Sequence, residues 1–125
     1  MIISVGQDRD FLNLKEFLFS FDFSHKELVS KQIEHSIIDK TQNDFFIAFR
    51  FYVDTLYNPL PVDFSGLAVV VEVLNGDNDH TMCELFVAHG YIVEYRIYNI
   101  NGTRLNMENF WRGSVAYDKF TTLKQ

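Results

Sequence analysis

The sequence predicts an α+β fold in which two N-terminal helices pack on one face of a mainly antiparallel sheet of about five strands. Apolar residues recur every three or four positions between about residues 11 and 35, and the period changes to two after residue 36. Helices followed by a series of strands are typical of this class, and they leave the other sheet face partly open. The 125 residues are expected to form a single domain, 1–125.

Two helices are expected before residue 36. Asp8 or Asp10 can cap a helix that begins near Phe11. Ser24 and Glu27 match the capping-box pattern and predict a second helix over residues 25–35. The apolar stripes are Phe11, Leu14, Leu18 and Phe21 in the first helix, and Leu28, Val29 and Ile33 in the second.

A β-hairpin is expected next. Residues 36–41 read as an extended segment, residues 42–44 supply turn chemistry, and residues 45–53 alternate between two faces. Pro59 and Pro61 then interrupt strand pairing, so residues 55–65 are expected to form a loop long enough to cross an end of the sheet.

Three further strands are expected at residues 67–74, 82–87 and 91–98, continuing the meander, and a last strand at residues 115–123. A three-residue loop at 88–90, with a left-handed Gly90, separates an apolar face from a mixed one and places Glu84 opposite Glu94. The apolar face would hold Cys83, Leu85, Val87, Tyr91, Val93, Tyr95 and Ile97. The mixed face would hold Met82, Glu84, Phe86, Ile92, Glu94, Arg96 and Tyr98.

Charge restricts the class of partner. The formal net charge is −6, and residues 51–95 contain seven acids but no Lys or Arg. Nucleic acids and anionic membranes are bound by basic patches, so neither is expected as a partner. A basic protein surface is the expected complement.

The chain is expected to act in the cytoplasm. The single Cys83 cannot form an intramolecular disulfide, and its apolar surroundings in the sequence predict a small buried hydrophobe. The N-terminal residues lack the apolar core of a signal peptide, and no apolar run is long enough to span a bilayer.

Three glutamates permit an enzymatic alternative. Glu72, Glu84 and Glu94 are expected on one face of neighbouring strands, where two carboxylates could act as acid and base in a hydrolase. A solvated face, with Arg96 offsetting the acids, explains the same pattern without catalysis. No nucleophile or phosphate-loop motif is present, so no catalytic residue is assigned.

Metal binding and cofactors are not expected. His80, Cys83 and His89 invite a zinc interpretation, but His80 and Cys83 would point to opposite faces of a strand. Residues 77–79 resemble part of a calcium loop but lack its later glycine and bidentate glutamate, so a plain turn is expected.

The open sheet face is instead expected to bind a protein. Twenty aromatic residues, of which 13 are Phe, are too many for one small core, so some should lie at the surface. Arg50 and Tyr52 are expected on that face with the strand glutamates. The residues expected to contact a partner are Asp54, Glu72, Asp77, Asp79, Glu84, Phe86, Glu94, Arg96, Tyr98 and Trp111.

The segments LVSKQIEHSIIDKTQNDFFIAFRFYV and ELFVAHGYIVEYRIYN resemble small α+β immunity proteins of bacterial polymorphic and contact-dependent growth inhibition toxin systems. The resemblance implies a non-catalytic protein, without cofactor, that neutralises a cognate toxin domain by occlusion. The alternatives are a homo-oligomeric or small-ligand-binding module and the carboxylate-dependent hydrolase. A monomer or a weak homodimer is expected.

Overall fold

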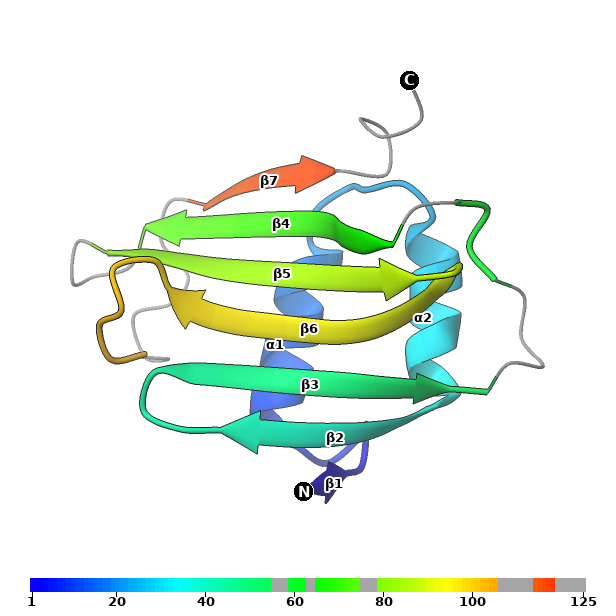
Figure 1. Ribbon diagram of the computed structural model, residues 1–125, viewed down its shortest axis with the longest axis horizontal. Helices are drawn as coiled ribbons and strands as arrows, with labels where there is room; N and C mark the ends of the chain where they lie inside the picture. Colours follow the sequence, from blue (N-terminus) through cyan, green and yellow to red (C-terminus); the bar gives the residue numbers. More distant parts are fainter. Residues whose placement is uncertain (55–58, 63–64, 75–78, 106–113, 119–125) are drawn as a thin grey trace.

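The computed structural model describes residues 1–54, 59–62, 65–74, 79–105 and 114–118. Two helices, α1 (Arg9–Phe19) and α2 (Lys26–Glu34), lie on one face of an antiparallel sheet (Figure 1). This arrangement confirms the α+β class and the position of both helices. No helix in the described ranges is both long and apolar enough to cross a membrane.

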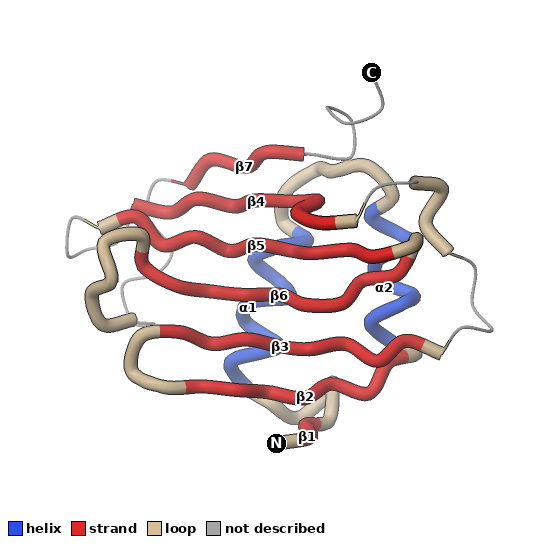
Figure 2. The backbone as a smooth tube through the Cα atoms, viewed as in Figure 1, coloured by secondary structure: helices blue, strands red, loops and turns tan. Residues whose placement is uncertain are grey.

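Within the described residues, the sheet has seven strands in the order β1-β2-β3-β6-β5-β4-β7 (Figure 2). The five long strands correspond to those expected. The short β7 confirms the expected last strand over residues 115–118, while residues 119–123 of that expectation lie outside the described residues. The short β1 was not expected, and β1 and β7 form the two edges of the sheet. The strand bounds are β1 Ile2–Ile3, β2 Ser36–Gln42, β3 Phe46–Val53, β4 Gly66–Leu74, β5 His80–Ala88, β6 Tyr91–Asn99 and β7 Ser114–Asp118.

The strand order corrects the expected meander, because β3 pairs with β6 and not with β4. The sheet therefore joins a β2–β3 hairpin to a separate β4–β5–β6 meander. The connection between them passes the β5–β6 turn, where the Leu60 N–H donates to the Gly90 carbonyl at 2.6 Å. A Cβ on Gly90 would lie 2.6 Å from Pro59 Cβ, so this close approach requires glycine.

The helix starts differ in their caps. Asp8 caps α1 as expected, since its carboxylate accepts a hydrogen bond from the Phe11 N–H at 2.9 Å. The N-cap of α2 is His25, in left-handed conformation with φ 62°, and its side chain makes no capping hydrogen bond. The predicted capping box was therefore wrong, because the helix begins one residue later than a Ser24 cap requires.

The core lies between the helices and one face of the sheet. Phe11 of α1 packs edge to face on Phe49 and Phe51 of β3, with ring centroids 4.9 and 6.2 Å apart. The predicted helical stripes face this core, with Leu28 partly buried at its border. Phe21 also packs there, but it lies beyond the end of α1 at Phe19, so the first stripe is helical only from Phe11 to Leu18. The helical residues that are buried are Phe11, Leu14, Phe17, Leu18, Val29, Gln32 and Ile33.

Gln32 is a polar exception in this interface and is 1% exposed. Its Nε2 donates to the Gly90 carbonyl at 3.0 Å, and its Oε1 accepts from the Ile92 N–H at 2.9 Å. One side chain of α2 thus satisfies two backbone groups of the β5–β6 hairpin, which fixes the helix layer on that turn.

The β5–β6 loop has two residues, not the three that we expected. His89 and Gly90 both have positive φ, 52° and 86°, and Ala88 pairs with Tyr91. A bulge at Val93 then shifts the register, so that Leu85 pairs with Tyr95 and Cys83 with Ile97. The core face therefore includes Ile92 and excludes Tyr91 and Val93. A regular two-residue loop would have placed Glu94 on the same face as Leu85, and the bulge prevents this.

Candidate binding face

The open face is the side of the sheet opposite the helices, and it faces the viewer in Figure 1. Strand pairing aligns its residues in rows across the sheet. Arg50, Glu94 and Phe86 form one row, and Ala48, Arg96 and Glu84 form the next. The predicted members that share this face are Arg50, Tyr52, Glu72, Glu84, Phe86, Glu94, Arg96 and Tyr98.

The register corrects one expected pair. Glu84 lies opposite Arg96 and not opposite Glu94, because the bulge at Val93 changes the alignment of the two strands. Opposite charges thus occupy directly facing positions, which favours pairing of these strands.

Arg96 is held in place by two neighbours. Its Nη2 lies 2.7 Å from Glu94 Oε2, and its guanidinium lies 5.0 Å from the centroid of the Phe86 ring. Burial and the adjacent Glu84 carboxylate raise the pKa of Tyr98. This part of the open face is ordered by its own contacts before any partner binds.

Glu72 and Asp79 also have partners within the chain. Glu72 Oε1 lies 2.6 Å from His80 Nδ1 at the start of β5. Asp79 is only 3% exposed, and its carboxylate accepts hydrogen bonds from the His80 and Asn101 N–H groups and from the Thr103 hydroxyl. Burial opposes ionisation of Asp79, but these hydrogen bonds outweigh it and lower its pKa.

The predicted contact set therefore divides into four groups. Glu72, Glu84, Phe86, Glu94, Arg96 and Tyr98 gather on the open face. Asp79 lies at the end of the sheet as expected, where it is buried by the chain itself. Asp54 is exposed directly after β3, while Asp77 and Trp111 lie outside the described residues.

A groove crosses the open face beside Ala48. It consists of two hollows, of about 250 and 440 Å³, which share Phe46, Ala48 and Glu94 as lining residues. The small Ala48 side chain alternates with the larger Phe46 and Arg50 along β3, so it leaves space between them. The first hollow also contacts Asp39, Thr41 and Arg50, and the second contacts Arg96 and Tyr98. We call this feature the Ala48 groove.

Sequence reasoning missed this groove. The sequence did contain an indication of it, because Ala48 is the one small residue among the large side chains that point to this side of β3, which are Phe46, Arg50 and Tyr52. Its significance depends on β6 lying next to β3, which supplies Glu94, Arg96 and Tyr98.

The three glutamates of the enzymatic alternative do not line the Ala48 groove together. Of Glu72, Glu84 and Glu94, only Glu94 lines the Ala48 groove. Cys83 is fully buried on the core side, and burial raises the pKa of its thiol. In the described part of the chain, no three His, Cys, Asp or Glu side chains are placed to hold a metal ion.

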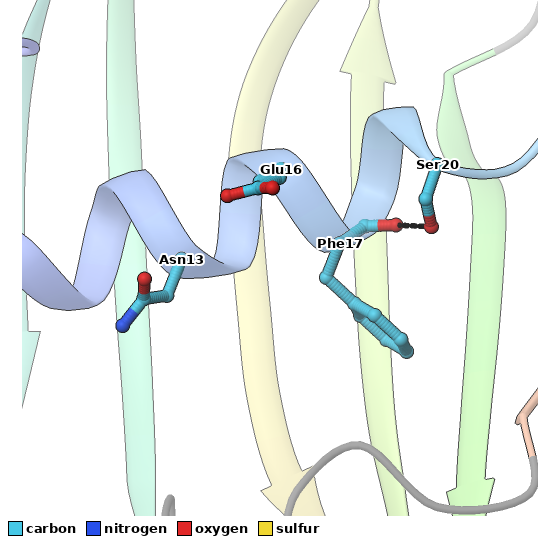
Figure 3. A pocket seen from close by; sticks show the side chains of 4 residues that line it. All are labelled: Asn13, Glu16, Phe17 and Ser20. Carbon is cyan, nitrogen blue, oxygen red and sulfur yellow. Dashed lines mark hydrogen bonds between the residues drawn. The ribbon is translucent and has the colours of Figure 1, made fainter.

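Another hollow, of about 360 Å³, lies along α1 and is lined by Asn13, Glu16, Phe17 and Ser20 (Figure 3). The Ser20 hydroxyl donates to the Phe17 carbonyl at 2.6 Å, so it stabilises the end of the helix. This hollow contains none of the residues that the sequence predicts for the site.

The chain was also compared with known proteins. No family model matches it, no curated protein matches it, and no solved structure matches it. The open face and its groove therefore carry the inference about function.

Proposed function

We propose that the chain is an immunity protein that binds a bacterial toxin domain through the open face and blocks it by occlusion. The observation that carries this proposal is the open face itself, where aromatic and charged side chains held by their neighbours surround a groove. Tyrosine and arginine are enriched at the energetic centres of protein interfaces, and side chains fixed in advance lose little entropy on binding. The resemblance to immunity proteins supports the class of partner.

The charge of the chain supports a basic partner. A net charge of −6 attracts a cationic domain over a distance and speeds its association. Close to the surface, Glu72 and Glu94 already contact His80 and Arg96. The acids are therefore expected to affect the association rate more than the dissociation rate.

We expect the cognate toxin domain to be encoded in a gene adjacent to the gene of this chain, and the proposal is tested with that domain. Glu72, Glu84 and Glu94 are changed together to Lys, and association is followed by stopped-flow fluorescence. The matched control changes Glu16, Glu27 and Glu34 to Lys, because these helical residues lie away from the open face and give the same change in net charge. The open-face variant should associate about tenfold or more slowly than the control variant.

Two outcomes would contradict the proposal. Equal slowing of both variants would show that only net charge matters and that the open face is not the docking surface. Full protection of cells from the toxin by the folded open-face variant, with unchanged binding, would have the same meaning.

A homo-oligomeric module is separated from this proposal by light scattering. The proposed inhibitor is expected to be a monomer alone and to form a one-to-one complex with the toxin domain. A stable dimer that loses its association when Tyr52 and Arg96 are changed to Ala would assign the open face to self-association instead.

A further inference from the structure

We infer that the Ala48 groove binds a segment of the partner in which a carboxylate lies next to an aromatic ring. This inference deepens the proposed function and rests on it only for the identity of the partner. The chemistry of the groove itself follows from the residues that line it.

The larger hollow fits a flat apolar group. Phe46 of β3 and Tyr98 of β6 are paired directly, and Ala48 lies two residues further along β3, opposite Arg96. All four residues line this hollow, and both aromatic side chains are half-buried in the sheet surface. Ala48 itself is 9% exposed and adds no bulk above the sheet. An aromatic ring placed over Ala48 would contact Phe46 and Tyr98 in the geometries that aromatic pairs favour.

The charges along the groove are not equally compensated. Asp39 Oδ1 accepts a hydrogen bond from the N-terminal amine at 2.6 Å, and Glu94 binds Arg96 at 2.7 Å. Arg50 lies between Asp39 and Glu94 in the register and lines the smaller hollow. It is exposed, and it forms no ion pair with any residue that the structure describes.

Arg50 therefore determines the charge of the group that fits. A guanidinium can donate two parallel hydrogen bonds to one carboxylate, which gives both affinity and orientation. A cationic group in the same place would meet Arg50 and Arg96, while the nearby carboxylates are already engaged. A neutral group would desolvate Arg50 without replacing its hydration, which weakens binding.

The inference is tested with small probes on the isotopically labelled full chain. The probe 3-phenylpropionate combines a ring with a carboxylate, 2-phenylethylamine combines a ring with a cation, and propionate lacks the ring. In proton–nitrogen correlation spectra, 3-phenylpropionate should shift the amide signals of Ala48, Glu94 and Arg96 saturably, with a Kd of about 1 mM. The other two probes should bind at least about tenfold more weakly.

Two variants test the roles of the groove residues. Ala48→Val fills the groove on the side of the sheet away from the core and should abolish the shifts. Arg50→Gln removes the charge and should weaken binding of 3-phenylpropionate about tenfold. Tyr52→Thr, which changes an exposed residue of the same face outside the groove, should bind as the unchanged protein does.

Three results would refute the inference. Preferred binding of 2-phenylethylamine, an absence of saturable shifts, or an unaltered affinity in folded Arg50→Gln would each refute a carboxylate-binding groove. Because the probes need no toxin, these outcomes are independent of the toxin-binding experiment. A failed probe titration beside successful toxin neutralisation would leave the proposed function standing without this groove.

Discussion

Gln32 allows a quantitative test of how the helix layer is fixed to the sheet. The proposed change is Gln32→Glu, which keeps the shape of the side chain. At neutral pH the ionised carboxylate of this variant could still accept the hydrogen bond from the Ile92 N–H, but it could not donate to the Gly90 carbonyl. A negative charge would also be buried at a position that is 1% exposed.

The expected cost follows from the protonation equilibrium. A protonated glutamic acid side chain can donate to the Gly90 carbonyl and accept from the Ile92 N–H, as Gln32 does. Holding that proton at pH 7 costs about 1.4 kcal/mol for each pH unit above the unfolded pKa of about 4.3, and therefore at most about 3.7 kcal/mol. We expect a loss of about 2–4 kcal/mol in the free energy of unfolding at pH 7.

The sign of the pH dependence distinguishes this explanation from a packing defect. Burial and the Gly90 carbonyl raise the pKa of the new carboxyl in the folded state, so the folded protein binds more protons than the unfolded one. The penalty should thus be smallest below about pH 4.3 and should grow as the pH rises toward the folded pKa.

The assay is urea unfolding, followed by circular dichroism, of the variant and the unchanged chain at pH 4.5, 5.5 and 7. Gln32→Leu should lose about 2–4 kcal/mol at every pH, because it leaves the Ile92 N–H without its acceptor. Gln42→Glu, at an exposed position, controls for the charge and should cost little. A Gln32→Glu penalty that is below about 1 kcal/mol at pH 7, or that does not change with pH, would refute the reasoning.

Two further predictions concern the fold. Gly90→Ala should destabilise the protein by more than about 2 kcal/mol in urea unfolding, because the new Cβ would meet Pro59 at 2.6 Å; Gly102→Ala, with φ 73° and no atom within 4 Å, should cost only about 1 kcal/mol. Equal penalties would exclude the Pro59 contact as the cause. Lys40 Nζ lies 3.1 Å from Asp8 and 3.0 Å from Asp10, so Lys40→Met should cost about 2–4 kcal/mol at pH 7. Burial lowers the pKa of Lys40, but Asp10 and Asp8 outweigh it and raise the pKa above 10.5, so this stabilisation should decline as the pH rises through the folded pKa. A penalty for Lys40→Met that remains constant across that alkaline range would contradict the ion-pair explanation.

Local interactions explain why much of the fold could be predicted from the sequence. The Asp8 cap depends on a group three residues away, and the alternation in residues 45–53 follows from the two faces of a strand. Alternation within β5 and β6 likewise predicted that Glu84, Phe86, Arg96 and Tyr98 lie on the open face. Those assignments survived an error in loop length because the bulge at Val93 restored the parity of the later residues.

Tertiary structure decided the features that depend on distant parts of the chain. Strand order required β6 to pair with β3, which no local pattern specifies. The same pairing forms the Ala48 groove from two hairpins. Asp79 and Gln32 are buried among partners that are distant in the sequence. Thr103 lies 24 residues from Asp79, and the Ile92 N–H lies 60 residues from Gln32, so no local pattern could predict either burial. Sequence periodicity determines which face of its own strand or helix a side chain occupies, but the neighbour that it meets there depends on long-range packing.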